Sequence, residues 1–163
     1  MSTDALPIAF TSHAHDHKDC VREALARAEE HCHRHGLRFT RIRRRVLELI
    51  WQSHTPTKAY DLLDRIREER GGAAPPTVYR ALDFLLDAGL VHRIESLNAF
   101  VGCDAAHGDR YPKFLICRHC HAVAEIAGPA VDRAIANEAR KVGFTIDRET
   151  IEIRGLCQRC AAG

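Results

Sequence analysis

Two pairs of cysteines near the C-terminus have the spacing of metal ligands. Each pair encloses two residues, Cys117 with Cys120 and Cys157 with Cys160. A turn of this kind directs two sulfur atoms toward one ion, and two such turns complete a tetrahedral zinc site of four thiolates. Because such a site keeps no open coordination position, we expect the zinc to hold the fold together and not to catalyse.

The remaining cysteines and the rest of the chain show no pattern of a catalytic centre. Cys20, Cys32 and Cys103 lie outside the two pairs. No segment joins a nucleophile to an oriented base, and no glycine-rich phosphate loop is present, so we expect no enzyme activity. The rival from another class is a thiol redox switch that cycles between dithiol and disulfide. The wide separation of the pairs and the lack of a thioredoxin-like pattern disfavour it.

Length and composition suit a soluble protein of one medium or two small domains. The chain has 163 residues, 45% of them hydrophobic, and a net charge of +2. A domain of about 60 residues buries only roughly 60% of its unfolded surface, so help from zinc and from a partner chain is expected. The N-terminus lacks a secretory signal, and no stretch approaches the ~20 apolar residues of a membrane span. We therefore expect a cytoplasmic location, where paired cysteines usually bind metal.

Apolar periodicity in the N-terminal half predicts four helices followed by a hairpin. Thr40 is expected to cap the second helix, and Gly36, Gly71 and Gly89 to end the first, third and fourth. The helices are predicted from about Asp19 to His35, from the Thr40 cap to about Ser53, from near Thr57 to Gly71, and from just after Pro75-Pro76 to Gly89. The strands are predicted over Leu90–Glu95 and Ala99–Cys103. A hairpin after a helix-turn-helix is the outline of a winged helix.

The C-terminal half reads as a small module around the cysteine pairs. We expect strands over Lys113–Cys117, Ala122–Ile126 and Phe144–Arg154, with a helix from Pro129 to Lys141. The predicted class is α+β, with an N-terminal winged-helix DNA-binding domain followed by a small α/β dimerisation domain that carries the four-cysteine zinc site. The expected bounds are a flexible His-rich tail 1–17, the winged helix 18–103, a hinge linker 104–111, and the dimerisation and zinc-binding domain 112–163. The exposed edges of so small a sheet favour a homodimer.

The segment Pro75–Leu85, with the sequence PPTVYRALDFL, resembles the recognition helix of the ferric uptake regulator (Fur) family of metal-sensing repressors. The resemblance covers most of the chain, and its supporting segments are Leu37–Thr40, Ala59–Leu63, Gly89–Ser96 and both cysteine pairs. Within the family, the chain looks most like the zinc uptake regulator branch. One departure is Arg41, where many members have proline, but the first turn of a helix does not require proline.

The resemblance implies a double-stranded DNA operator, expected to be palindromic and AT-rich. In the major groove, the fork of Arg80 would match two acceptors of guanine, while Tyr79 would contact a thymine methyl or a phosphate near Thr77. Phosphates would be held by Arg38, Arg43, Arg44, Arg45 and Lys58. The alternatives are that the arginine cluster is only a solvated helix face and that Tyr79 is a half-buried packing residue.

The resemblance also implies a regulatory metal site. His92, Cys103, His107 and Glu125 match the ligands of the family in order, and one ion bound by all four would tie the two domains together. A thiolate among them favours zinc over ferrous iron. His119 or His121 is an alternative to His107. The expected cofactor is therefore Zn²⁺, structural and regulatory, with two or more ions per chain.

The function implied by the resemblance is a homodimeric, zinc-responsive repressor of zinc-uptake genes that does not associate with a membrane. The nearer alternative is an iron or peroxide sensor of the same family, which would need a regulatory site richer in histidine and carboxylate. A weaker third metal site is also conceivable at the end of the first helix and in the tail, although a solvated helix face is the simpler interpretation. Its residues are His31, Cys32, His33 and His35, with His13, His15 and His17.

Overall fold

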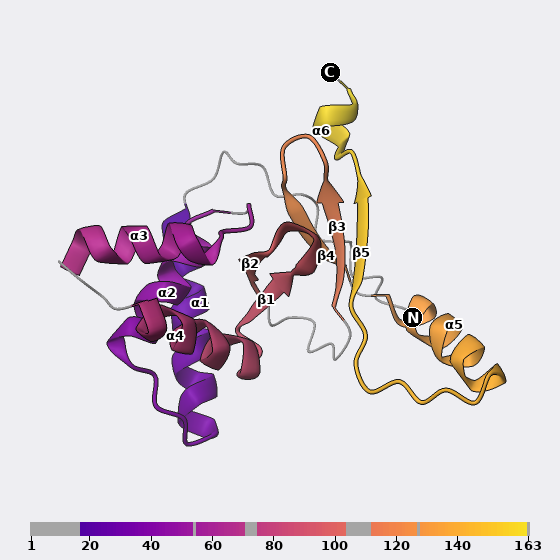
Figure 1. Cartoon of the computed structure of the whole chain (residues 1–163), viewed down its shortest axis with the longest axis horizontal. Helices are drawn as coiled ribbons and strands as arrows, with labels where there is room; N and C mark the ends of the chain where they lie inside the picture. The colour runs from indigo at the N-terminus through magenta and orange to yellow at the C-terminus, as the bar shows by residue number, and fades with distance from the viewer. Residues whose placement is uncertain (1–16, 54, 71–74, 104–111, 127, 163) are drawn as a thin grey trace. The chain divides into compact units, whose positions relative to one another are not determined.

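The computed structural model describes residues 17–53, 55–70, 75–103, 112–126 and 128–162 (Figure 1). These residues fall into two compact units, here called the N-terminal unit (17–103) and the C-terminal unit (112–162). Residues 1–16 of the expected tail and the whole expected linker 104–111 lie outside the described residues. The proposed bounds of these two segments stay predictions.

The N-terminal unit consists of helices and a hairpin, as predicted. Its helices are α1 (His17–Arg34), α2 (Arg41–Trp51), α3 (Ala59–Arg70) and α4 (Pro75–Asp87), and its strands are β1 (Val91–Ile94) and β2 (Ala99–Gly102). The strands are antiparallel, with His92 opposite Val101. A 3₁₀ turn, η1 (Glu95–Leu97), joins them, and Asn98 completes the connection in the left-handed region at φ 47°. Asparagine tolerates this region better than most residues.

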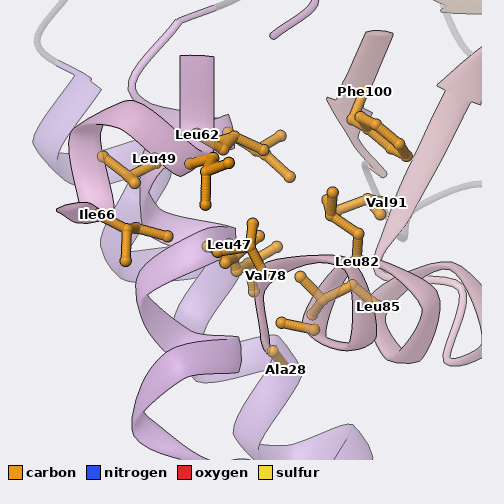
Figure 2. Packing of buried hydrophobic residues seen from close by; sticks show 14 residues of the cluster. Ala28, Leu47, Leu49, Leu62, Ile66, Val78, Leu82, Leu85, Val91 and Phe100 are labelled. Carbon is orange, nitrogen blue, oxygen red and sulfur yellow. The ribbon is translucent and has the colours of Figure 1, made fainter. Parts of the chain in front are cut away.

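A single apolar cluster holds these elements together (Figure 2). Leu47 and Ile50 of α2 are 1% exposed, and they belong to the same cluster as Leu62 of α3 and Leu82 of α4. Each fully buried side chain of this size contributes about 1.5–3 kcal/mol relative to an exposed one. The hairpin joins the cluster through Val91 and Phe100. The wing is therefore packed onto the helices.

Thr40 is the N-cap of α2, as predicted, but within the described residues its side chain makes no capping hydrogen bond. The starts of the next two helices differ from the prediction. Helix α3 begins at Ala59 because Thr57 pairs with Phe100 of β2, donating from its N–H at 2.9 Å and accepting at 2.8 Å. Helix α4 begins at Pro75, since proline fits the first turn, where the backbone N–H has no partner within the helix.

Gly102 lets β2 approach the indole of Trp51 closely. A Cβ atom at this position would lie 2.2 Å from Cε2 of Trp51. We expect Gly102→Ala to lower the free energy of unfolding by about 1–3 kcal/mol, because overpacking forces neighbouring groups apart. Urea denaturation followed by Trp51 fluorescence and by circular dichroism measures this. In a Trp51→Leu background the same change should cost less, and an equal cost in both backgrounds would contradict the contact.

The C-terminal unit is a three-stranded sheet with two helices. The central strand β3 (Lys113–Cys117) pairs antiparallel with β4 (Val123–Ile126) and parallel with β5 (Ile151–Gly155). Helix α5 spans Pro129–Lys141, as predicted, and α6 (Gln158–Ala161) is a single turn that the sequence did not predict.

The strand predicted over Phe144–Arg154 is wrong in its first half, because only Ile151–Gly155 forms β5. Gly143 turns the chain at φ 70°, and the N–H of Phe144 donates to the carbonyl of Ala139 at the end of α5. Phe144 and Ile146 line a groove beside α5. Phe144 and Ile146 therefore alternate with polar residues because they face this groove, and not because they belong to a strand.

An ion pair between a buried lysine and a half-buried aspartate joins α5 to the sheet. The side chain of Lys113 is 1% exposed, and its Nζ lies 2.5 Å from a carboxylate oxygen of Asp132, in the first turn of α5. The stem of Lys113 also packs close to Gly128, where a Cβ atom would lie 3.0 Å from its Cδ. A buried lysine needs such a partner because an isolated charge is costly to remove from water.

Candidate functional site

The four paired cysteines converge in the C-terminal unit. Their sulfur atoms all lie within 4.8 Å of one another, and those of Cys120 and Cys157 are 3.8 Å apart. A tetrahedral site with Zn–S bonds of about 2.3 Å has edges of about 3.8 Å between its sulfur atoms. A disulfide would need about 2.05 Å. The geometry therefore fits a zinc site of four thiolates, as the spacing predicted.

The backbone of the two cysteine turns explains this convergence. The N–H of Cys117 donates to Ala122 at 2.9 Å, and the N–H of His121 donates to Cys117 at 3.0 Å, which closes the first turn. His121 adopts φ 59° to do so. The parallel register of β3 and β5 sets Cys117 opposite Gly155, two residues before Cys157. Sheet pairing thus brings the second turn to the first.

The electrostatics of the cluster also suit a cation. Backbone N–H groups of Cys120 and Cys157 lower the pKa of the Cys117 thiol to about 5. At Cys160, burial and then hydrogen bonds with the other thiols raise the pKa to about 12. Four thiolates cannot share so small a volume without positive charge, and Zn²⁺ supplies that charge while it deprotonates its ligands.

The residues predicted for a regulatory site are divided between the units. In the N-terminal unit, His92 lies on β1, and Cys103 follows β2 with its N–H donating to Leu90 at 3.1 Å. In the C-terminal unit, Glu125 lies on β4 opposite Phe114. His92, Cys103 and Glu125 are all half-buried. His107 lies outside the described residues, so its role stays a prediction.

Two alternatives to His107 are described by the structure. His119 lies within the first cysteine turn and His121 follows it, and both are exposed. His121 contributes its backbone to closing that turn.

Helix α4 has one face in the core and one face exposed. Val78, Leu82 and Leu85 are buried, whereas Thr77 and Arg80 are exposed. Tyr79 is 51% exposed. About half of this side chain is therefore accessible to a partner. The exposed face of the helix thus carries the side chains that were predicted to read DNA.

The predicted phosphate-binding residues have different environments. Arg38 and Lys58 are exposed. Arg43 lies over the ring of Phe84, 3.5 Å from its centre, and donates to the carbonyl of Arg38. Arg44 pairs with Glu29 of α1. Both arginines are half-buried. A phosphate would therefore have to bind beside the Phe84 ring at Arg43 and beside Glu29 at Arg44.

Arg45 has a structural role that the sequence analysis missed. Its Nε donates to Glu69 of α3 at 2.8 Å, and its Nη1 donates to Glu48 at 2.7 Å. The hydrogen bond to Glu69, and then that to Glu48, raise the pKa of Arg45 above its ordinary value, although burial opposes this. Arg45 therefore ties α2 to α3. The contact with Glu48 could have been predicted, because the two residues are three positions apart on one helix. The contact with Glu69 could not, because that residue is 24 positions away on α3.

Among the helices of the described residues, none combines the length and apolarity needed to cross a lipid bilayer.

Comparison with known proteins places these features in a family. The model of the ferric uptake regulator family matches residues 34–154. The zinc uptake regulation protein of Escherichia coli (strain K12) is 41% identical over 144 residues, which are 88% of this chain and 84% of that protein. A solved zinc uptake regulator complexed with zinc and DNA is 41% identical with a TM-score of 0.81, covering 87% of this chain and 95% of its own. The holo form of XcZur is 44% identical with a TM-score of 0.80, and the match covers 86% of this chain and 99% of that chain. The chain therefore belongs to the ferric uptake regulator family.

Proposed function

We propose that this protein is a zinc-responsive, DNA-binding transcriptional repressor that controls zinc-uptake genes in the cytoplasm. The observation that carries the proposal is the similarity, across both units, to a zinc uptake regulator solved with zinc and DNA. Membership in a family of regulators places the chain outside the enzymes.

Two classes of zinc have different tasks in this proposal. The four-thiolate ion is permanent and stabilises the C-terminal unit. A second, exchangeable ion is bound by His92 and Cys103 of the N-terminal unit with Glu125 of the C-terminal unit, and His107 completes its coordination. Because this ion joins the two units, it fixes the angle between them. Cys103 supplies the thiolate that favours zinc over ferrous iron.

DNA recognition follows from the exposed face of α4. Arg80 reads a guanine in the major groove, while Tyr79 and Thr77 contact neighbouring groups. Arg38, Arg43, Arg44 and Lys58 hold phosphates, and Arg45 contributes less because Glu48 and Glu69 already engage it. In a homodimer, two such helices meet half-sites about 34 Å apart, which suits a palindromic, AT-rich operator.

The test is a selection from random DNA. Zinc-loaded protein enriches binding sequences from a pool of duplexes, and fluorescence anisotropy then measures affinity for them with and without a chelator that spares the structural zinc. Tight binding only with exchangeable zinc is the expected result. Equal affinity in both conditions would overturn zinc control. Recovery of binding by Fe²⁺ but not by Zn²⁺ would favour the iron sensor.

Arg80→Ala should weaken binding to the selected DNA by about 10- to 150-fold, since one bidentate contact to guanine is worth about 1–3 kcal/mol. The preference of the protein for guanine at the position that Arg80 contacts should become weaker as well. Anisotropy with single-base variants of the DNA measures both effects. Arg65→Ala is the matched control, because Arg65 is an exposed arginine on α3. Equal losses in the two variants would count against base readout by Arg80.

The surface of the C-terminal unit supports a homodimer. A groove of about 700 Å³ runs beside α5, with Ile135, Val142 and Phe144 in its lining. Val142 and Phe144 are 78% and 64% exposed. Exposed apolar side chains that gather around a groove in this way are typical of an interface.

Phe144→Asp should therefore weaken dimerisation by about 30-fold or more, because a central aromatic residue of an interface contributes at least about 2 kcal/mol. The protomer should keep its fold, since this side chain is exposed in it. Sedimentation equilibrium measures the change. Tyr60→Asp, which also removes an exposed aromatic ring, is the control in the N-terminal unit. An unchanged dimer in Phe144→Asp would exclude this surface from the interface.

A further inference from the structure

We infer that His31 and His35, at the C-terminal end of α1, form a separate binding site for a divalent transition-metal ion. His31 lies in the last turn of α1, and His35 follows the helix directly, four positions later. Their ring centres lie 4.3 Å apart and the ring planes differ by 25°. Two histidines at this spacing on one helical face are an established way of binding zinc.

The backbone prepares His35 for this role. Its Nδ1 lies 2.8 Å from the carbonyl oxygen of His31, which also accepts the backbone N–H of His35 at 3.1 Å. Donation from Nδ1 fixes the tautomer in which Nε2 keeps its lone pair, and such a hydrogen bond is typical of histidines that bind metals. His35 is exposed and His31 is half-buried. The ring of His35 can therefore adjust toward an ion while His31 stays in place.

The charges around the pair are compatible with a cation. Arg34, in the last turn of α1, pairs with Glu30 at 3.3 Å. Arg27 lies one turn before His31, and its guanidinium lies over the Trp51 ring, 5.5 Å from the centre. The pair also lies at the negative end of the helix dipole, which favours cations.

The lowered pKa of His31 also favours metal binding. Burial, then His35 and Arg34, lower the pKa of His31 below its ordinary value. A lowered pKa favours the neutral imidazole, which is the form that binds metals. Neutral imidazole suits Zn²⁺, Ni²⁺ and Cu²⁺, so the class of ligand is a first-row divalent ion.

Paramagnetic Ni²⁺ tests the site residue by residue. It is titrated into full-length, zinc-loaded protein labelled with ¹⁵N, and the ring signals of His31 and His35 are followed by NMR. Both should broaden together at the same nickel concentration. His35→Gln should weaken nickel binding at His31 by about tenfold or more, because one of two linked ligands is lost.

His33→Gln is the matched control, since His33 is exposed on the same turn but residues two apart do not face each other. It should leave nickel binding at His31 unchanged. The site should also persist when His13, His15 and His17 are replaced with alanine. Equal weakening by His33→Gln, no weakening by His35→Gln, or loss of the response without the tail histidines would each overturn the inference.

Discussion

Replacing Cys117 with serine should remove the tightly held zinc from the protein and unfold much of the C-terminal unit. Cys117 is 1% exposed at the end of the central strand, and its sulfur accepts the N–H of Cys157 at 3.4 Å. The substitution therefore breaks both the coordination and the link between the two cysteine turns. Structural zinc contributes about 10–16 kcal/mol in small zinc-binding peptides, which is as large as the whole folding stability of a typical domain, about 5–15 kcal/mol.

Elemental analysis after dialysis against a mild chelator measures the effect, together with circular dichroism on heating. We expect the wild-type protein to retain one zinc per chain and Cys117→Ser to retain none. Cys32→Ser is the matched control, because Cys32 is also buried, at 2% exposure, but belongs to α1. It should keep the retained zinc. A Cys117→Ser protein with a full zinc content and an unchanged melting curve would exclude the four-thiolate site.

Patterns local in the chain predicted most of the elements and the cluster of four cysteines. The period of Val46, Leu49 and Ile50 predicted the buried face of α2, and the spacing of the cysteines predicted the cluster. Both signals are short-range, because a helix face repeats within a few residues and a CxxC turn is closed by its own backbone. Such features need no knowledge of the tertiary structure.

Interactions that depend on distant partners were not predictable in this way. In the sequence, Arg45 was grouped with the other basic residues of its cluster. Its hydrogen bond to Glu69, which is 24 positions away, is seen only in the structure. The space requirement at Gly102 depends on Trp51, from a different element. The alternation after Phe144 resembled a strand, because a groove and a sheet both select side chains that alternate in polarity. In each case tertiary packing, and not local propensity, decided the outcome.

The second large effect is expected in DNA binding. Cys103→Ser should abolish the response to exchangeable zinc while it leaves the structural zinc and the fold intact. Cys103 is half-buried directly after β2, and serine replaces its thiolate with a much poorer zinc ligand. Zinc must bind the active arrangement about 10⁴-fold, or about 5.5 kcal/mol, more tightly to shift the protein from mostly inactive to mostly active.

If the exchangeable ion no longer binds, the active arrangement is populated at about 1% instead of about 99%, and DNA affinity in the presence of zinc falls about 100-fold. Anisotropy on the selected DNA over a series of buffered zinc concentrations measures this. Cys20→Ser is the matched control, because Cys20 is also half-buried in the N-terminal unit but lies on α1. A Cys103→Ser protein that still gains DNA affinity with zinc would remove Cys103 from the regulatory site. If it instead kept a response to iron, the iron sensor would become the better account, because such a site relies on histidine and carboxylate ligands and has no need of the thiolate.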